Sequence, residues 1–524
     1  MKPRLLVLGI DAADPLLVER WTADGTMPNL ARLMREGLSG RSGGLEGFCV
    51  GSTWPSFYTG VSPAGHGHHS LVQLRPGSYD YYEVAAGDVT KAPPFWEHLG
   101  AQGRRVAILD VPLTRLSPKI NGVQTVEWGS HDALYGFCAH PPELQHDIAR
   151  RFGGHPLGSS CDGQRRNADD YREFVSRLTR GAKVKGEITR HVLSLERWDF
   201  AMQVFTEAHC AGHQCWHVHD PHHPAHDRAV AAQVEPMREV YAAVDREVGT
   251  IVDALDDAPV IVLAAHGMAW WFGAQFLLRR ILVALGVTVA LPEADAQAAP
   301  GGVVDRAAQR LPRWAKDLLR PVRDALRPTP AATHAPPTLG VDAGASLCFP
   351  VHNGLAVGGI RLNLAGREPQ GRLAAGREAD EFCARLARQL LALRDEHSGR
   401  ALVRSVRRTA DLYQGAHLGD LPDLLVEWND DAPTGSAIVG NGAAATIRAT
   451  SPELGVVEGT NTYGRTGEHR PRGFFVARGP GIAPGRLARE VSLLDFAPTF
   501  CAMLGTPLPR AEGAPIAELL AASR

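Results

Sequence analysis

Short apolar runs alternate with stretches of helical periodicity along most of the chain. Continuous apolar runs are typical of strands buried on both faces of a parallel sheet. The runs that we expect to form buried strands are Leu5–Ile10, Val106–Leu109, Phe200–Phe205, Val260–Leu263, Leu424–Val426 and Phe474–Ala477. Their alternation with helices predicts an α/β fold with a mostly parallel central sheet and helices on both of its faces.

Helices are expected where apolar positions recur with helical spacing. The segment Met27–Met34 has Pro28 at its second position, and proline is favourable in the first turn of a helix. Further helices are predicted at Met237–Leu255, Glu378–Leu393 and Leu494–Leu504.

The amino-acid composition changes between Leu291 and Ala345, where Ala, Pro and Gly cluster around a basic amphipathic segment, Arg313–Arg320. We interpret this stretch as an insertion rather than as part of the sheet. The chain has 524 residues, and single cores stop growing at roughly 250–300 residues. We therefore predict a core formed by residues 1–290 and 411–524, with a smaller inserted cap or linker region at residues 291–410.

The charges are nearly balanced, with 55 basic and 57 acidic side chains and a formal net charge of -2. This balance leaves no positive surplus for a nucleic acid polymer or an anionic membrane. No apolar stretch approaches the ~20 residues that a membrane helix needs, and the apolar amino-terminal run is too short for a signal peptide. The eight cysteines are scattered, unlike those of secreted disulfide scaffolds. We therefore expect a cytoplasmic protein with reduced thiols.

Two acidic residues, Asp11 and Asp14, follow the first predicted strand. Ligands of open α/β sheets bind at the carboxyl ends of the strands, and a carboxylate there can hold zinc, magnesium or manganese. An aspartate in a turn also commonly caps a helix. Asp11 is the better metal-ligand candidate of the two, and Asp14 is interpreted as a cap.

Two hydroxyl groups, those of Ser52 and Thr53, precede Pro55 at a predicted helix start. The positive end of the helix dipole favours an alkoxide and an approaching anion, and a nearby metal would lower the hydroxyl pKa further. Hydroxyl residues before a proline are also ordinary caps. Ser52 and Thr53 are therefore alternative candidate nucleophiles.

Histidines are dense after the strand that ends at Phe205. If Glu207–His217 is helical, His209, His213 and His217 share one face, and two or three imidazoles can converge on one ion. If the segment is a loop, Glu207 becomes the carboxylate partner of His213. Four later histidines are expected to be exposed to solvent: His219, His222, His223 and His226.

Two more histidines lie at predicted strand ends. His266 follows a buried strand and precedes Gly267, which permits a sharp turn, and His469 lies just before the strand Phe474–Ala477. Either residue alone is more often structural. Together they indicate a site at the edge of the sheet.

These motifs, in their order along the chain, resemble the alkaline phosphatase superfamily, in particular its branch of type I phosphodiesterases and nucleotide pyrophosphatases. The shared positions are the Asp11 strand end, Met27–Leu30, Thr59–Pro63 with His66-Gly67, Gly212-His213, His266–Met268, Gly467–Pro471, Asp495–Thr499 and Leu504-Gly505. The resemblance implies an alkaline-phosphatase-like three-layer sandwich with a smaller inserted cap. It also implies a hydrolase or transferase that acts on a small phosphorylated substrate.

In that family two metal ions, usually zinc, flank a Thr or Ser nucleophile. Carried over to this chain, the resemblance implies one metal site with Asp11 and His266 and another with His213 and His469. It places the nucleophile at Thr53, or at Ser52 if the turn is shifted. Arg470 is a candidate for binding the phosphate group.

Three features differ from the family pattern. Ala265 replaces the aspartate that usually precedes His266, and the spacing from Thr53 to Thr59-Gly60 is about one helical turn shorter than usual. His209 stands where the family has an aspartate. That carboxylate is therefore either replaced by imidazole or supplied by Glu207.

The loss of two carboxylates favours weaker binding of one of the two metals. His209, His213 and His469 would then form a three-imidazole site with an open position, like a catalytic zinc that activates water. The cofactor is thus expected to be one or two divalent ions, zinc or alternatively manganese.

The sequence is compatible with three functions. The first is cleavage or transfer at a phosphodiester or phosphomonoester. The second is a degenerate family member that binds a phosphorylated ligand or a partner without hydrolysing it. The third is a biosynthetic enzyme with an altered reaction. The oligomeric state is also left open.

Overall fold

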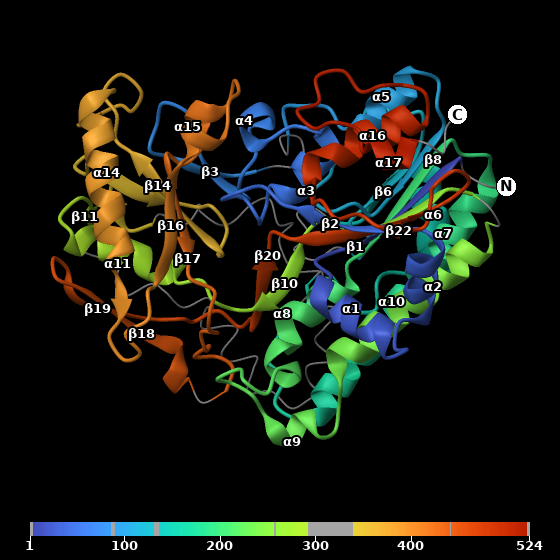
Figure 1. Ribbon diagram of the computed structural model, residues 1–524, viewed down its shortest axis with the longest axis horizontal. Coiled ribbons are helices and arrows are strands. Elements are labelled where there is room, and N and C mark those ends of the chain that lie inside the picture. The colour runs from blue at the N-terminus through green and yellow to red at the C-terminus, as the bar shows by residue number, and fades with distance from the viewer. Residues whose placement is uncertain are drawn as a thin grey trace.

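The computed structural model describes residues 4–84, 90–129, 136–158, 160–255, 258–291, 339–440 and 442–520. Figure 1 shows two regions, a large sheet with its helices in the right half of the view and smaller sheets with helix α14 in the left half. The predicted α/β class with a mostly parallel central sheet is confirmed.

The large sheet has ten strands within the described residues, in the order β22-β2-β21-β9-β1-β8-β5-β6-β7, with β23 paired to β2. Neighbouring strands from β9 to β6 are parallel, whereas β21 and β7 run antiparallel to their neighbours β9 and β6. The strands are β1 Leu5–Ile10, β2 Leu38–Gly43, β5 Val106–Leu109, β6 Gly122–Val126, β7 Cys138–His140, β8 Phe200–Phe205, β9 Val260–Ala264, β21 Gly473–Arg478, β22 Gly485–Arg486 and β23 Val491–Ser492.

Strand β1 explains why apolar runs predicted this sheet. Leu5 and Val7 point into one hydrophobic core, and Leu6 and Leu8 point into a second core on the other face. Because both faces are covered, no polar alternation is left in the sequence. The strands predicted at residues 5–10, 106–109 and 200–205 are confirmed to the residue.

Helices cover both faces of the large sheet. The layer below the sheet in Figure 1 contains α1 Pro15–Ala23, α2 Pro28–Glu36, α6 Pro142–Phe152, α7 Ala168–Leu195, α8 Glu207–His219, α9 Arg228–Ala231 and α10 Pro236–Asp253. The opposite layer contains α3 Thr53–Thr59, α4 Pro63–His66, α5 Phe95–Ala101, α16 Phe496–Met503 and α17 Ala517–Leu520, with the 3-10 turn η5 Leu493–Asp495. The helices predicted around Pro28, Met237 and Leu494 are confirmed, with ends shifted by a few residues.

The smaller region consists of antiparallel sheets. Strands β13 Cys348–Val351, β14 Val357–Leu362, β17 Leu424–Trp428 and β16 Val403–Arg408 form one sheet, and β15 Arg394–Asp395, β18 Thr446–Ser451 and β19 Gly455–Thr460 form another. The helices are α11 Gln275–Ala284, α14 Arg377–Leu391 and α15 Thr409–Leu412, with 3-10 turns η3 Leu418–Asp420 and η4 Ala443–Ala445. The run predicted as a buried strand at residues 424–426 is a strand, but of this antiparallel sheet.

The predicted division into a core and an insertion at residues 291–410 stays a prediction. Residues 292–338 of that insertion, with the basic piece Arg313–Arg320, lie outside the described residues. Three short strand pairs complete the fold: β3 Val72–Leu74 with β4 Tyr81–Glu83, β11 Val289–Ala290 with β12 Val341–Asp342, and β10 Gly267–Trp270 with β20 Gly467–Arg470.

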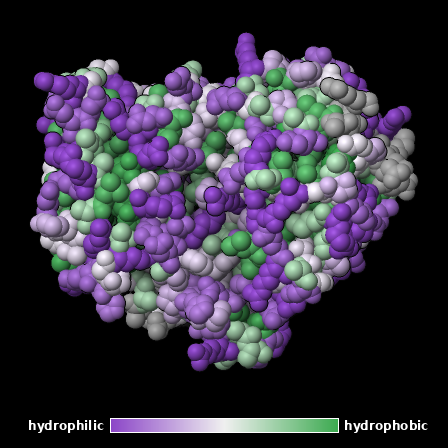
Figure 2. Space-filling model, in the orientation of Figure 1, coloured by the Kyte–Doolittle hydropathy of each residue, from purple (hydrophilic) through white to green (hydrophobic). Residues whose placement is uncertain are grey.

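The surface in Figure 2 is mostly hydrophilic, and the hydrophobic residues on it are scattered in small groups. Among the residues that the structure describes, no helix combines the length and the hydropathy needed to cross a bilayer.

Candidate metal centre

Four chain segments meet at the carboxyl edge of the large sheet. Asp11 follows β1, and His209 and His213 lie on α8, which follows the neighbouring strand β8. His266 follows β9 on the other side of β1. Strand β20 pairs antiparallel with β10, the strand that begins after His266, and this pairing brings His469 to the same edge.

Three histidines face one another there. One ring nitrogen from each of His209, His213 and His469 lies within 4.8 Å of the other two, and all three residues are buried. The ring centroids are separated by 4.7 Å between His209 and His213 and by 4.8 Å in each pair with His469. The structure thus assembles a three-imidazole group that can hold a divalent cation.

Hydrogen bonds orient two of these rings. The Nδ1 atom of His213 lies 2.8 Å from the carbonyl oxygen of Gly467, which can only accept, so Nδ1 carries the proton. The Nδ1 atom of His209 lies 2.7 Å from the carboxylate of Asp11. In both rings the lone pair of a neutral imidazole is then on Nε2. Such partners are the usual means by which proteins fix the tautomer of metal-binding histidines.

Both carboxylate oxygens of Asp11 accept hydrogen bonds from neighbouring side chains. Its Oδ2 atom accepts from His209, its Oδ1 atom accepts from the Trp54 indole at 2.7 Å, and His266 Nε2 lies 3.8 Å from Oδ1. Burial by itself would raise the pKa of Asp11, but the charge and hydrogen bond of His209, with His266 and Trp54, hold it below its ordinary value.

His266 lies beside Asp11 and 4.7 Å from His469, measured between ring centroids. Burial lowers the pKa of His266 to about 4, so its ring is neutral at physiological pH. The preceding residue, Ala265, is fully buried and supplies no carboxylate. The predicted pair Asp11 and His266 is therefore close together, with Asp11 also bonded to His209.

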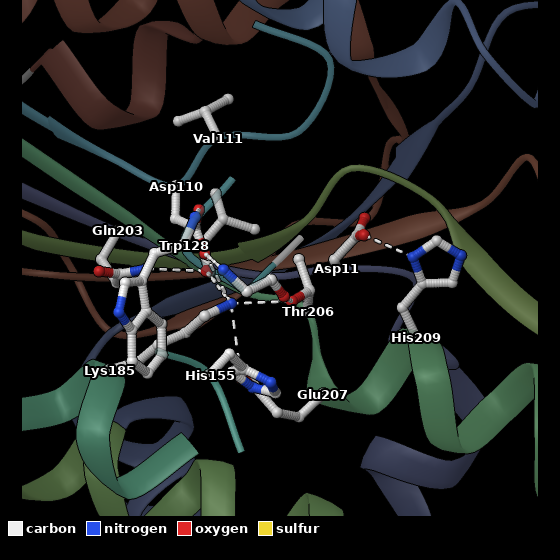
Figure 3. A network of polar contacts seen from close by, with 12 residues as sticks. Asp11, Asp110, Val111, Trp128, His155, Lys185, Gln203, Thr206, Glu207 and His209 are labelled. Carbon is white, nitrogen blue, oxygen red and sulfur yellow. Dashed lines mark hydrogen bonds and ion pairs between the residues drawn. The ribbon is translucent and has the colours of Figure 1, made fainter. Parts of the chain in front are cut away.

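Glu207 belongs to a different group. The segment is the helix α8, as one prediction had it, and Glu207 Oε1 lies 3.1 Å from His155 Nε2 and 3.5 Å from Lys185 Nζ. Figure 3 shows this group apart from the Asp11–His209 pair. Residues two positions apart on a helix point to opposite sides, so Glu207 and His209 cannot serve one ion together.

Further along α8, His217 does not join His209 and His213, with which it was predicted to share a face. The ring of His217 lies 2.9 Å from the Tyr171 hydroxyl and 2.9 Å from Thr466 Oγ1, and it is not part of the three-histidine group. His223, which was expected to be exposed, is buried, and its Nδ1 accepts from the backbone N–H of Ala225. That prediction was wrong because the turn after α8 folds back onto the helix.

The hydroxyls of Ser52 and Thr53 are buried at the start of α3. Ser52 donates to the carbonyl of Phe48 at 3.2 Å, and Thr53 donates to the carbonyl of Cys49 at 3.1 Å. The next residue, Trp54, donates to Asp11, which holds the first turn of α3 beside the carboxyl end of β1.

Asp14 acts as the predicted helix cap, because its Oδ1 accepts from the backbone N–H of Leu17 at the start of α1. Two glycines explain the Gly-His motif of α8. A Cβ on Gly467 would lie 2.1 Å from the carbonyl oxygen of Gly212, and one on Gly212 would lie 2.2 Å from the sulfur of Met268. At Gly467, where the opposing atom belongs to the backbone, only glycine permits this close approach of strand and helix.

A cavity of about 890 Å³ opens beside the histidines. His469, Arg470 and Cys49 line it, together with residues of the smaller antiparallel sheet such as Trp428. The Arg470 guanidinium lies 3.9 Å from the ring centroid of Phe272, and its Nε lies 3.5 Å from Asp430. Burial lowers the pKa of Arg470 to about 10, and the side chain stays charged at neutral pH.

The sequence did not point to Lys185, Asp110 or Trp54. Lysine and aspartate are usually exposed, so a fully buried Lys185 on an amphipathic helix carries no distinguishing sequence signal. Trp54 lies within the predicted nucleophile segment, but its indole bond to Asp11 depends on tertiary structure.

Comparison with known proteins gives a family and a fold. A family model described as type I phosphodiesterase/nucleotide pyrophosphatase matches residues 5–285. The wild-type alkaline phosphatase PafA has a similar structure, with 12% sequence identity, a TM-score of 0.52 and coverage of 99% of each chain.

Two further solved structures resemble the chain more distantly. Phosphonoacetate hydrolase from Sinorhizobium meliloti 1021, in complex with phosphonoacetate, is 14% identical, with a TM-score of 0.48 and 95% coverage of both chains. Murine ectonucleotide pyrophosphatase/phosphodiesterase 5 is 12% identical, with a TM-score of 0.45 and 98% coverage of both chains. No curated protein matches the chain significantly.

Proposed function

Because the chain belongs to the type I phosphodiesterase/nucleotide pyrophosphatase family of the alkaline phosphatase superfamily, we propose that it hydrolyses phosphoryl esters with a divalent cation held by His209, His213 and His469. The observation that supports this most is the convergence of one ring nitrogen from each histidine within 4.8 Å. Three imidazoles with an open fourth position are a common donor set of catalytic zinc.

The donor set fits zinc better than manganese, because imidazole suits zinc and carboxylate oxygens suit manganese. When bound, the cation would supply positive charge to the oxygens of the phosphoryl group. Asp11 and the Gly467 carbonyl hold the rings of His209 and His213 in the tautomer that presents Nε2.

One metal, rather than the two usual in the family, is proposed for this chain. Asp11 accepts from His209 and Trp54, and the buried Ala265 offers no carboxylate beside His266. Asp11 therefore orients a ligand of the three-histidine site.

Thr53 is the proposed nucleophile. Its hydroxyl donates to the carbonyl of Cys49, a residue that lines the cavity beside His469, and its neighbour Trp54 bonds to Asp11. Attack by Thr53 Oγ1 would form a bond to phosphorus as the alcohol leaves, and water would then hydrolyse the phosphothreonine. Arg470 would bind the phosphoryl oxygens from the cavity wall.

The test is turnover of bis-p-nitrophenyl phosphate by the zinc-loaded protein, together with elemental analysis of bound metal. We expect one zinc per chain and a loss of kcat of about 10³-fold or more in Thr53→Ala. Ser52→Ala is the matched control and should keep most of the activity. Two zinc ions per chain would refute the mononuclear site, and equal activity of Thr53→Ala and wild type would refute the nucleophile.

Ala265 also favours a second candidate function, the binding of a phosphorylated ligand without hydrolysis. This alternative predicts phosphonate binding with no turnover of any phosphoryl ester at full metal occupancy. Measured turnover that depends on His213 would exclude it.

A further inference from the structure

The cavity beside His469 differs in character from the three-histidine group. Four aromatic side chains line it: Trp216, Trp270, Phe272 and Trp428. They come from α8, from β10 and the loop that follows it, and from β17 of the smaller sheet. Its volume of about 890 Å³ is in the range of pockets that enclose a small organic ligand.

The charges around the cavity cancel locally. Four arginines and five carboxylates line it. Three of the arginines are within ion-pair distance of a lining carboxylate: Arg404 with Asp430 at 3.0 Å, Arg472 with Glu490 at 3.2 Å and Arg470 with Asp430 at 3.5 Å. Arg41 pairs at 2.6 Å with Glu19, which does not line the cavity. The lining therefore offers no surplus of positive charge to a ligand.

We propose that this cavity selects esters with a single phosphoryl group and a bulky, uncharged apolar or aromatic substituent. The inference rests on the proposed function, because the phosphoryl group is taken to lie at His469. A nucleoside triphosphate brings several negative charges and would meet five carboxylates without excess arginine. An uncharged ring would instead gain free energy by leaving water and packing against the aromatic side chains of the cavity.

Arg470 would lie between the phosphoryl group and the apolar substituent of such a ligand. It follows the histidine His469 in β20, and its guanidinium covers the ring of Phe272 at 3.9 Å from the centroid. A second aromatic residue, Trp270, lies on the paired strand β10, with its indole N–H donating to the carbonyl of Asp430 at 3.2 Å. The charged end of the cavity thus adjoins a wall whose aromatic faces are held in place.

Binding of three phosphonates to the zinc-loaded protein, measured by isothermal titration calorimetry, tests this proposal without requiring turnover. Methylphosphonate, phenylphosphonate and 4-carboxyphenylphosphonate share the phosphoryl end and differ in apolar area or in one added charge. We expect phenylphosphonate to bind about tenfold tighter than methylphosphonate, and the added carboxylate to remove most of that gain.

Trp270→Ala should lower the affinity for phenylphosphonate about tenfold. Tyr463→Ala, which removes an exposed aromatic residue outside the cavity, should change it less than twofold. Equal affinity of the wild type for methylphosphonate and phenylphosphonate, or for phenylphosphonate and its carboxylated form, would overturn the substrate class alone. If no phosphonate binds, the proposed function fails, and this inference fails with it.

Discussion

Two buried polar groups lie at neighbouring strand ends of the same sheet, one around Lys185 and one formed by the three histidines. Figure 3 shows the Lys185 group and, beside it, the pair of Asp11 and His209. Around Lys185 every charge meets an opposite charge, because Nζ lies 2.9 Å from Asp110 and 3.5 Å from Glu207 and donates to Thr206 at 2.8 Å. In the three-histidine group, one ring nitrogen from each residue lies within 4.8 Å of the other two. The second arrangement is the one that we propose to bind a cation.

The pKa shifts of Lys185 and Glu207 also reflect the pairing of opposite charges. Burial alone would lower the pKa of Lys185, but Asp110 and Glu207 raise it above its ordinary value. Burial alone would raise the pKa of Glu207, but Lys185 and His155 lower it. At both residues the opposite charges therefore outweigh desolvation in setting the pKa. We expect this group to act in the fold and not in ligand binding.

The largest effect on stability is expected from Lys185→Met. Removal of one partner from a buried ion pair leaves Asp110 and Glu207 uncompensated, which costs about 3–5 kcal/mol of the free energy of unfolding. Urea unfolding of the metal-free protein measures this loss.

Lys183→Met is the matched control on the same helix. Lys183 is exposed and lies 3.8 Å from Glu187, so its loss should cost less than about 1 kcal/mol. Similar losses in the two variants would mean that the Lys185 group does not carry the stability we assign to it.

His213→Ala should lower zinc affinity by more than about 100-fold, because loss of an outer-shell partner alone costs roughly 10–100-fold. His217→Ala, one helical turn later, is the control, since His217 bonds to Tyr171 and Thr466 instead. Competition with a chelator measures both affinities. An equal loss in His217→Ala would show that the three-histidine assignment is mistaken.

Asp11→Asn and Glu207→Gln separate the two groups directly. If Asp11 orients His209, its replacement by the neutral amide should weaken zinc binding about 10–100-fold while one zinc per chain is kept at saturation. Glu207→Gln should change unfolding more than zinc affinity, because Glu207 pairs with Lys185. A larger zinc loss in Glu207→Gln would reverse the roles given to the two carboxylates.

The smallest effect is a difference in pH dependence. The folded pKa of Lys185 is raised above its ordinary value of 10.5, so its stabilisation is fully present below pH 10.5 and is lost only as the pH rises through the raised value. Zinc affinity should fall at the other end of the scale, as acid protonates the ligands. The stability difference between wild type and Lys185→Met should thus stay constant from pH 7 to about 10.

The strands were predictable because parallel strands buried on both faces leave uninterrupted apolar runs. Residues 424–428 show the limit of that signal, since a buried antiparallel strand in the smaller sheet has the same apolar pattern. The sheet to which a run belongs is decided by long-range pairing. Sequence spacing alone therefore could not assign β17 to the smaller sheet.

The candidate site followed the same rule. Helical spacing correctly placed His209 and His213 on one face of α8. It could not show that His217 turns to Tyr171, or that Asp11 reaches His209, because both contacts join segments distant in sequence. Strand ends indicated the location of the site, and tertiary hydrogen bonds divided its residues into groups.

The close approach of Gly467 to the Gly212 carbonyl bears on which cation the proposed site would accept. Gly212 directly precedes His213, and Gly467 lies two residues before His469. A Cβ on Gly467 would lie 2.1 Å from the Gly212 carbonyl oxygen. The separation of two ligand-bearing elements is thus fixed by backbone in contact with backbone, and not by adjustable side chains. If the three histidines hold a cation as proposed, such a frame would resist expansion around a larger ion. Two residues that are not among the proposed ligands would then contribute to discrimination by ionic radius.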